Sequence, residues 1–289
     1  SQEIFNKKYR HPIEKRGDQQ LRQKLVNRIK PFILRRLKTD VAKELPEKTT
    51  IEVNIDMNDQ QSKLYEAVRA TMQASIQKIV AEKGFKRSQI QILDALLKLR
   101  QVCCHPSLLK LDSVKSGQAH SAKLEQLMDM VVPMVEEGRK ILIFSQFTSM
   151  LELIAQQLDH AEIGYVKLTG QTKKRDEVIT AFQSGQVPVF LISLKAGGVG
   201  LNLTTADTVI HYDPWWNPAA EDQASDRAWR IGQDKPVFVY KLITNKSIEE
   251  KILALQQNKA ELAHSILSTD HEGEAKLTEN DVMNLFEKF

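Results

Sequence analysis

The chain has 289 residues, 42% of them hydrophobic, so it is long enough for one large domain or two modest domains with a true core. Its 41 Lys and Arg and 37 Asp and Glu give a net charge of +4. This composition argues against a mainly disordered chain, and no apolar run approaches the roughly 18 residues that a membrane-spanning helix needs. We expect a soluble intracellular protein and, because the chain starts at Ser1 with polar sequence, a fragment of a longer one.

Basic side chains are concentrated near the N-terminus. Residues 1–50 hold 14 basic and 6 acidic side chains, a net charge of +8, which leaves −4 for the rest of the chain. A solvated helix face commonly explains such a run, and a surface facing a polyanion is the alternative. Charge alone does not separate the two.

The first hundred residues are predicted to be mostly helical. Apolar residues recur at helical spacing over 18–38 and 59–104, whereas 49–55 alternates apolar and polar residues as a half-buried strand does. The adjacent Cys103 and Cys104 cannot form a disulfide framework, and the chain offers no second ligand pair for zinc. We interpret both cysteines as packing residues in a reducing compartment and expect no metal site.

From about residue 121 the pattern changes to long helical stretches that alternate with short apolar, β-branched runs. The runs are predicted strands, at 141–144, 165–168, 189–193, 208–212 and 237–243. Helices predicted at 149–160, 172–183 and 219–229 lie between them. This alternation predicts a parallel sheet with helices on both faces, an α/β fold that is Rossmann-like or RecA-like.

The last part of the chain is predicted to be a long amphipathic helix followed by an acidic tail. Ser247 and Glu250 have the spacing of a capping box at the start of a helix over 247–267. Residues 270–289 carry six acidic and two basic side chains and are predicted to be peripheral. We therefore divide the chain into a basic helical segment, a helical insertion with one strand, an α/β lobe and a C-terminal region, at 1–50, 51–115, 116–245 and 246–289.

Polar and small residues follow the predicted strands directly, as in Ser145-Gln146 and Asp213-Pro214-Trp215-Trp216. The carboxyl ends of parallel strands share one edge, where ligands bind in open α/β sheets. Ordinary turn and cap formation explains about half of these residues. The rest indicate a ligand site at this edge.

A glycine cluster follows the predicted strand at 189–193. Gly197, Gly198 and Gly200 would let the backbone turn sharply and a phosphate approach its N–H groups. The cluster is neither a dinucleotide fingerprint nor a P-loop. Taken alone, it is a weak signal.

Two arginines in the stretch 222–233, Arg227 and Arg230, are three residues apart on a predicted helix, so we expect both on one face. Such a pair is commonly just solvated, but beside a glycine loop it could clamp a multiply charged phosphate. The chain has no Walker A sequence and no acidic pair at a strand end that could hold Mg²⁺. These features predict half of an active site.

Several motifs together resemble the C-terminal half of a Snf-type (SWI/SNF-related) helicase-like ATPase. They are LRQVCCHP (99–106), ILIFSQFTSML (141–151), LTGQT with Arg175 (168–175), LISLKAGGVGLNLTTADTVIHYDPWWNP (191–218) and DQASDRAWRIGQ (222–233). Upstream, IKPFILRRLKTDVAKELPEK (29–48) resembles the link between the two lobes of that family. The resemblance covers residues from about 29 to 245.

The resemblance implies a second RecA-like lobe that works with an N-terminal lobe of the same protein. In this family the N-terminal lobe holds ATP and Mg²⁺, and the C-terminal lobe supplies arginine fingers, matched here by Arg227 and Arg230. The positions that would lie near the nucleotide are Gly198, Gly200 and Gln223. Residues that fall where the family touches the backbone of double-stranded DNA are Gln146, Thr169, Ser193, Lys195 and Trp216.

Some positions depart from the commonest pattern of the family. Lys195 stands where relatives often have arginine, and Asp226 and Trp229 stand where many have glycine and histidine. The spacing of the two arginines is kept, but water-orienting help from position 229 is in doubt. The departures favour a prokaryotic member, which would be cytoplasmic and nucleoid-associated, whereas a eukaryotic one would be nuclear.

We therefore expect the C-terminal lobe of an ATP-dependent translocase on double-stranded DNA, inactive as an ATPase without its N-terminal lobe. One alternative is a lobe of an RNA-directed helicase of the same superfamily. Another is a module without catalytic activity that binds nucleic acid or protein through its basic first fifty residues. Stimulation by duplex DNA compared with single-stranded RNA separates the first two readings.

Overall fold

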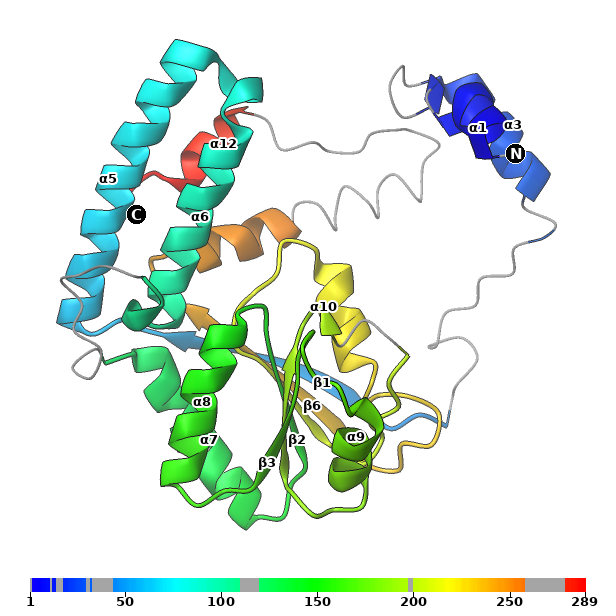
Figure 1. The fold of residues 1–289 in the computed structure, drawn as a ribbon, viewed down its shortest axis with the longest axis vertical. Helices are drawn as coiled ribbons and strands as arrows, with labels where there is room; N and C mark the ends of the chain where they lie inside the picture. The colour runs from blue at the N-terminus through cyan, green and yellow to red at the C-terminus, as the bar shows by residue number, and fades with distance from the viewer. Residues whose placement is uncertain are drawn as a thin grey trace. The chain divides into compact units, whose positions relative to one another are not determined.

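A computed structural model of the chain describes residues 2–10, 12–13, 18–29, 32, 44–109, 120–196, 200–257 and 279–289 (Figure 1). The chain divides into two units, residues 1–44 and 45–289. In the first unit, helix α1 (Gln2–Phe5) leads into a π-helical stretch, Asn6–Arg10, and helix α3 spans Gln19–Ile29.

A tyrosine connects the elements of the first unit. The rings of Phe5 and Tyr9 stack with centroids 5.7 Å apart, and Arg28 Nη1 of α3 donates to the Tyr9 hydroxyl at 3.0 Å. The Asp18 carboxylate accepts a hydrogen bond from Leu21 N at 3.0 Å, which caps the start of α3. The helix predicted at 18–38 is therefore present as far as residue 29, and most of its remainder lies outside the described residues.

Six parallel strands form the sheet of the second unit, in the order β1-β6-β5-β2-β4-β3. Their bounds are β1 Lys48–Ile55, β2 Ile141–Ser145, β3 Tyr165–Leu168, β4 Val189–Ser193, β5 Thr208–His211 and β6 Val237–Thr244. Five of them match the predicted apolar runs. The predicted RecA-like α/β fold is confirmed.

Strand β1 is one of the two edge strands of this sheet, and β3 is the other. It pairs with β6 over its whole length, from Lys48 beside Val237 to Ile55 beside Thr244. The prediction that this strand accompanies the helical insertion is therefore wrong, because the strand belongs to the sheet of the lobe. The alternating pattern of 49–55 predicts a half-buried strand, but it carries no information about the partner strand.

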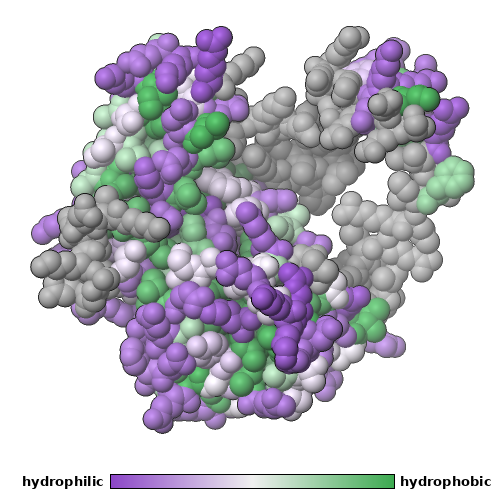
Figure 2. Space-filling view, viewed as in Figure 1, coloured by the Kyte–Doolittle hydropathy of each residue, from purple (hydrophilic) through white to green (hydrophobic). Residues whose placement is uncertain are grey.

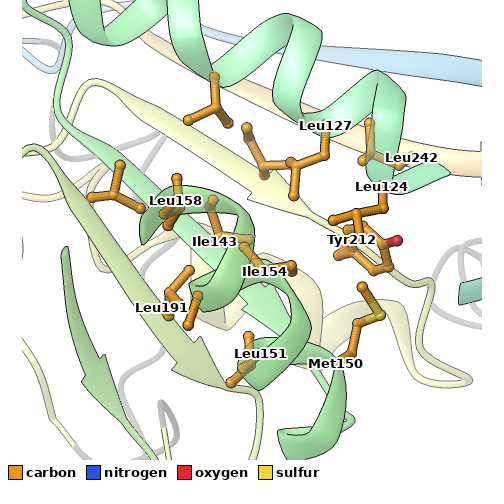
Figure 3. Close-up of a cluster of buried hydrophobic side chains, with 14 of the residues drawn as sticks. Leu124, Leu127, Ile143, Met150, Leu151, Ile154, Leu158, Leu191, Tyr212 and Leu242 are labelled. Atoms are coloured by element: carbon orange, nitrogen blue, oxygen red, sulfur yellow. The ribbon is translucent and has the colours of Figure 1, made fainter. Parts of the chain in front are cut away.

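Helices cover both faces of the sheet. Alternate side chains of each strand point to opposite faces, so each face carries apolar side chains that a layer of helices buries. Ile141 and Ile143 of β2 pack on one side against helices α7 (Ala122–Glu136) and α8 (Thr148–His160). Figure 3 shows this layer, with Leu127 and Ile154 in the same cluster as Ile143. On the other side, Leu142 and Phe144 belong to a second cluster, which includes residues of α9 (Arg175–Gln183) and α10 (Pro218–Ser225).

The helical insertion is a pair of helices with a core of its own. Helix α5 spans Asp59–Lys83 and helix α6 spans Gln89–Cys104, with Gly84 between them at φ +75° (Figure 1). The adjacent Cys103 and Cys104 are buried in two different clusters, and burial raises the pKa of both thiols. Their interpretation as packing residues is confirmed.

The C-terminal region contributes to this helical core. Residues 248–257 are helical, while the remainder of the helix predicted at 247–267 lies outside the described residues. The end of the chain is not peripheral: helix α12 (Glu279–Leu285) and Phe286 pack in the cluster of α5 and α6, with Phe286 fully buried. The prediction from the acidic composition is wrong there, because Val282, Leu285 and Phe286 form an apolar face among the charges.

Part of the surface of α6 is apolar. Ile90, Leu93 and Leu97 are exposed along the helix. Figure 2 shows hydrophobic and hydrophilic side chains interspersed over the α5 and α6 part of the molecule. Among the described residues, no helix is both long and apolar enough to cross a membrane.

Candidate nucleotide and DNA interface

The parallel sheet brings most of the predicted site residues to its carboxyl edge. Ser145, at the end of β2, is the register partner of Ser193 at the end of β4, and Leu194 N donates to Ser145 O at 3.0 Å. Phe144 of β2 pairs with His211 of β5, so the segment that starts at Tyr212 leaves the same edge. The register therefore places the segments after β2, β4 and β5 next to one another.

Gln146 is held by charged groups on two sides. Its Nε2 donates to Asp213 Oδ2 at 2.5 Å, and its Oε1 accepts from Arg100 Nη1 of helix α6 at 2.7 Å. Ser145 Oγ also donates to Asp213, at 2.5 Å. Burial raises the pKa of the Asp213 carboxyl above its ordinary value, while Arg100 and the Ser145 hydroxyl act in the opposite direction.

Trp215 and Trp216 follow Asp213 in a loop, and both are half-buried. Buried Glu221 of α10 fixes this loop: its Oε1 accepts from Trp215 N at 2.6 Å, and its Oε2 pairs with Lys241 Nζ of β6 at 2.7 Å. Trp216 also packs against the helical core. The loop is thus attached to the sheet on one side and to the insertion on the other.

Three further predicted DNA contacts differ in exposure. Thr169 lies in a turn after β3, where its hydroxyl accepts from Gln171 N at 3.3 Å and its own N–H donates to Thr172 Oγ1 at 2.9 Å. The Ser193 side chain is only 4% exposed, whereas Lys195 is exposed to solvent. Of the residues after β4, Lys195 is therefore the more accessible to a nucleic acid.

The glycine loop is described only in part. Gly197 and Gly198 lie outside the described residues. Gly200 has φ +36°, a conformation that favours glycine, and apart from its chain neighbours no atom of the described residues lies within 4 Å of the place a Cβ would take. Beyond it, Leu203 N donates to Arg227 O at 3.0 Å. This bond connects the glycine loop to residues 226–232, which we call the arginine segment.

The two arginines do not lie on a helix. Helix α10 ends at Ser225, and residues 226–232 form successive turns, so the prediction of one helix over 219–229 is wrong. The cap residue Asp226 adopts φ −67° and ψ −3°. One helical bond follows, from Trp229 N to Ser225 O at 3.2 Å, and Arg230 N then donates to Ala228 O in a tight turn. Periodicity of apolar residues continues through these turns and does not reveal the break.

The arginines nevertheless stay close in space. Arg227 is 8% exposed, and Arg230 is exposed. Burial lowers the pKa of Arg227, and the charge of Arg230 lowers it further. An anion placed by both guanidinium groups would relieve this repulsion, which suits a phosphate. Gln223, the other predicted neighbour of a nucleotide, is exposed on α10.

Two of the three residues that depart from the family pattern, Asp226 and Trp229, contact residues near the start of β1. Trp229 Nε1 donates to Pro46 O at 2.7 Å, just before β1. Lys48 Nζ lies 4.8 Å from the centroid of the Trp229 ring and 3.6 Å from the Asp226 carboxylate. These contacts attach the arginine segment to the beginning of β1.

A buried histidine supports the base of α10 and predicts a pH dependence. His211 Nε2 lies 2.8 Å from Ser225 Oγ, and burial lowers the pKa of His211 to about 4. In the unfolded chain His211 binds a proton near pH 6.5, whereas in the folded chain it stays neutral until about pH 4. The free energy of unfolding therefore falls as the pH drops from about 6.5 to about 4. We expect a loss of about 2 kcal/mol in the free energy of unfolding between pH 7 and pH 5 from this group.

Urea unfolding at the two pH values measures this loss. His211→Gln is expected to remove it, and His160→Gln, at the exposed end of α8, should leave it unchanged. An identical pH dependence in His211→Gln and in the unmodified chain would contradict the assignment.

The sequence analysis did not select two residues at this edge as site residues, Arg100 and Asp213. Both stand in motifs that carry the family resemblance, LRQVCCHP and DPWWNP. The available signal for Arg100 was its position on the apolar face of the helix, four residues after Leu96 and three before Cys103. Its partners lie 46 and 114 residues away, at Gln146 and Pro214, so spacing could not identify them.

Comparison with known proteins identifies the family to which this chain belongs. Residues 1–108 match the model of the SNF2-related domain, and residues 122–232 match that of the helicase conserved C-terminal domain. The C-terminal domain of the Sulfolobus solfataricus SWI2/SNF2 ATPase is 32% identical, with a TM-score of 0.65 over 84% of this chain and 100% of that domain. The chain belongs to the SWI2/SNF2 family.

Two further relatives extend the comparison for this SWI2/SNF2 chain. The S. solfataricus SWI2/SNF2 ATPase core, solved in complex with double-stranded DNA, is 36% identical with a TM-score of 0.64, covering 93% of this chain and 56% of that one. An uncharacterized ATP-dependent helicase of Mycoplasma pneumoniae is 38% identical over 97% of this chain. The chain spans only 27% of that helicase. The prokaryotic origin stays a prediction.

Proposed function

We propose that the chain is the C-terminal lobe of an ATP-dependent translocase on double-stranded DNA. Its carboxyl sheet edge would hold the DNA backbone, and its arginine segment would complete the hydrolysis of ATP held by an N-terminal lobe of the same protein. One observation carries this proposal. Arg227 and Arg230 lie close to each other and next to the segment that follows Gly200, in a chain without a Walker A sequence. The DNA complex of the Sulfolobus relative supports the choice of DNA.

The arginine segment would contact the anionic phosphates of an ATP molecule that the N-terminal lobe holds. Arg230 is exposed and would approach the triphosphate, where a guanidinium group stabilises charge on the transferred phosphoryl group. Arg227 is mostly buried and would act beside it. Gln223, Gly198 and Gly200 are the proposed neighbours of the nucleotide.

The part of the chain that the structure describes has no group of three His, Cys, Asp or Glu side chains that could hold a metal ion. The family resemblance assigns Mg²⁺ to the N-terminal lobe, so the proposed part of this chain in ATP hydrolysis rests on its arginines.

The proposed DNA contacts suit phosphate and sugar more than bases. Lys195 offers an exposed ammonium group, and Gln146 and Thr169 offer polar side chains at the same edge. Ser193 and Trp216 complete the proposed set, with Trp216 placed against the sugar edge or minor groove. Contacts of this kind hold DNA without reading its sequence, which a translocase requires.

The test compares ATP hydrolysis by residues 1–289 alone with hydrolysis by a protein that carries both lobes. Each is assayed without nucleic acid, with duplex DNA and with single-stranded RNA. We expect duplex DNA to stimulate the two-lobe protein and no turnover by the isolated chain. Turnover by the isolated chain would contradict the half-site, stronger stimulation by RNA would favour an RNA-directed helicase, and DNA binding carried by residues 1–50 without stimulation would favour a module lacking catalytic activity.

A further inference from the structure

Arg100 is a buried cation that connects the helical insertion to the sheet edge. Its side chain leaves α6 and is 2% exposed. Nη1 donates to Gln146 Oε1 at 2.7 Å, and Nη2 donates to Pro214 O and lies 3.7 Å from the Asp213 carboxylate. One guanidinium group therefore contacts the segments that follow β2 and β5.

Aromatic rings enclose the same guanidinium group. Its central carbon lies 5.9, 5.7 and 5.5 Å from the ring centroids of Phe147, Trp215 and Trp216. A planar guanidinium can stack on rings while donating in its own plane in two directions, which an ammonium group cannot do. The site is thus built for arginine rather than for any cation.

The Arg100 contact also fixes which way the Gln146 amide points. A guanidinium donor requires the amide oxygen, and the Asp213 carboxylate requires the amide nitrogen. Once both partners are satisfied, the NH₂ group keeps one further N–H to donate. That orientation suits a phosphate oxygen, whereas a flipped amide would present its oxygen to it.

We propose that Arg100 is a positioning residue for DNA binding. It orients the Gln146 amide and holds the Trp215–Trp216 loop, and being buried it does not touch DNA itself. The inference rests on the proposed function and adds to it that the helical insertion controls the DNA-facing edge of the lobe.

Arg100→Lys tests this role in a protein that carries both lobes, by the dependence of ATP hydrolysis on duplex DNA concentration. Lysine keeps the charge beside Asp213 but loses the two-directional contact, so we expect the DNA concentration for half-maximal stimulation to rise about tenfold. The rate at saturating DNA should stay within about twofold, because the arginine segment is unchanged. Lys98→Met is the matched control, since Lys98 lies on the same helix and pairs with Asp94 on its exposed side.

The outcomes separate the two levels of the proposal. Wild-type protein that DNA does not stimulate would contradict the proposed function, and the inference would fall with it. Stimulated wild-type protein with equal half-saturation in Arg100→Lys, or with an equal loss in Lys98→Met, would overturn the role of Arg100 alone. A parallel fall in the saturated rate and in the thermal unfolding midpoint would also overturn it, because it would indicate a merely structural residue.

A second variant covers the case in which Arg100→Lys does not fold. Arg100→Met combined with Asp213→Asn leaves no unpaired buried charge, and it should fold while the indoles beside position 100 lose their cation. We expect an altered tryptophan fluorescence spectrum and weaker DNA binding in the double variant. Wild-type DNA affinity in this folded variant would contradict the inference.

Discussion

Arg230→Ala in a two-lobe protein is expected to lower the kcat of ATP hydrolysis by about a thousandfold or more, the usual effect of losing an arginine finger. ATP binding should be largely kept, because the guanidinium stabilises charge that develops only in the transition state. Arg230 is exposed, so the thermal unfolding midpoint should not change. Steady-state hydrolysis, together with titration of a fluorescent ATP analogue, measures the two effects separately.

Lys235→Ala is the matched control for this experiment. Lys235 is an exposed cation of the loop that leads from the arginine segment into β6, so its removal changes the same net charge. Equal losses in the two variants would show that only general electrostatic attraction is involved. A loss of ATP binding in Arg230→Ala that matches the loss of kcat would rule out the finger role.

Lys123→Met is expected to lower the free energy of unfolding by about 3–5 kcal/mol, because it leaves the buried Glu249 carboxylate without its partner. Lys123 and Glu249 are 1% and 0% exposed, and Lys123 Nζ also donates to Leu242 O at 3.3 Å. Burial lowers the pKa of Lys123, but the charge of Glu249 and other nearby groups outweighs that effect and the pKa is raised. The pair connects α7 to the helix at 248–257.

Urea unfolding of the single and double variants measures this pair. Lys123→Met combined with Glu249→Leu should recover most of the loss, since no buried charge remains uncompensated. Lys174→Met breaks an exposed pair with Glu177 and should cost less than about 1 kcal/mol. A similar small loss in Lys123→Met would mean that Glu249 is solvated or neutral in the folded chain.

The centre of the sheet was predictable because strands β2, β4 and β5 are buried on both faces. Residues 141–145 are all buried, so they read as a continuous apolar run, and the same holds for 189–193. The carboxyl-edge position of Gln146 and Ser193 follows from the parallel topology alone. These conclusions need only local composition and one rule of connectivity.

The remainder depends on contacts between distant parts of the chain. Arg100 has partners after two different strands, and no local pattern records them. The break after Ser225 depends on turn geometry at Asp226, which apolar periodicity does not encode. Phe286 is buried because it packs in the hydrophobic cluster of α5 and α6, whereas composition at that end of the chain reports only its charge.

The pairing of β1 with β6 has a consequence for biosynthesis. A ribosome releases β1 early, yet its only sheet partner in the described chain, β6, emerges after the whole of β2 to β5. Until then β1 is a nascent segment with unsatisfied backbone groups and an apolar side, which invites aberrant association. Closure of such a long loop also slows folding. We therefore expect newly made chains to depend on molecular chaperones during this interval.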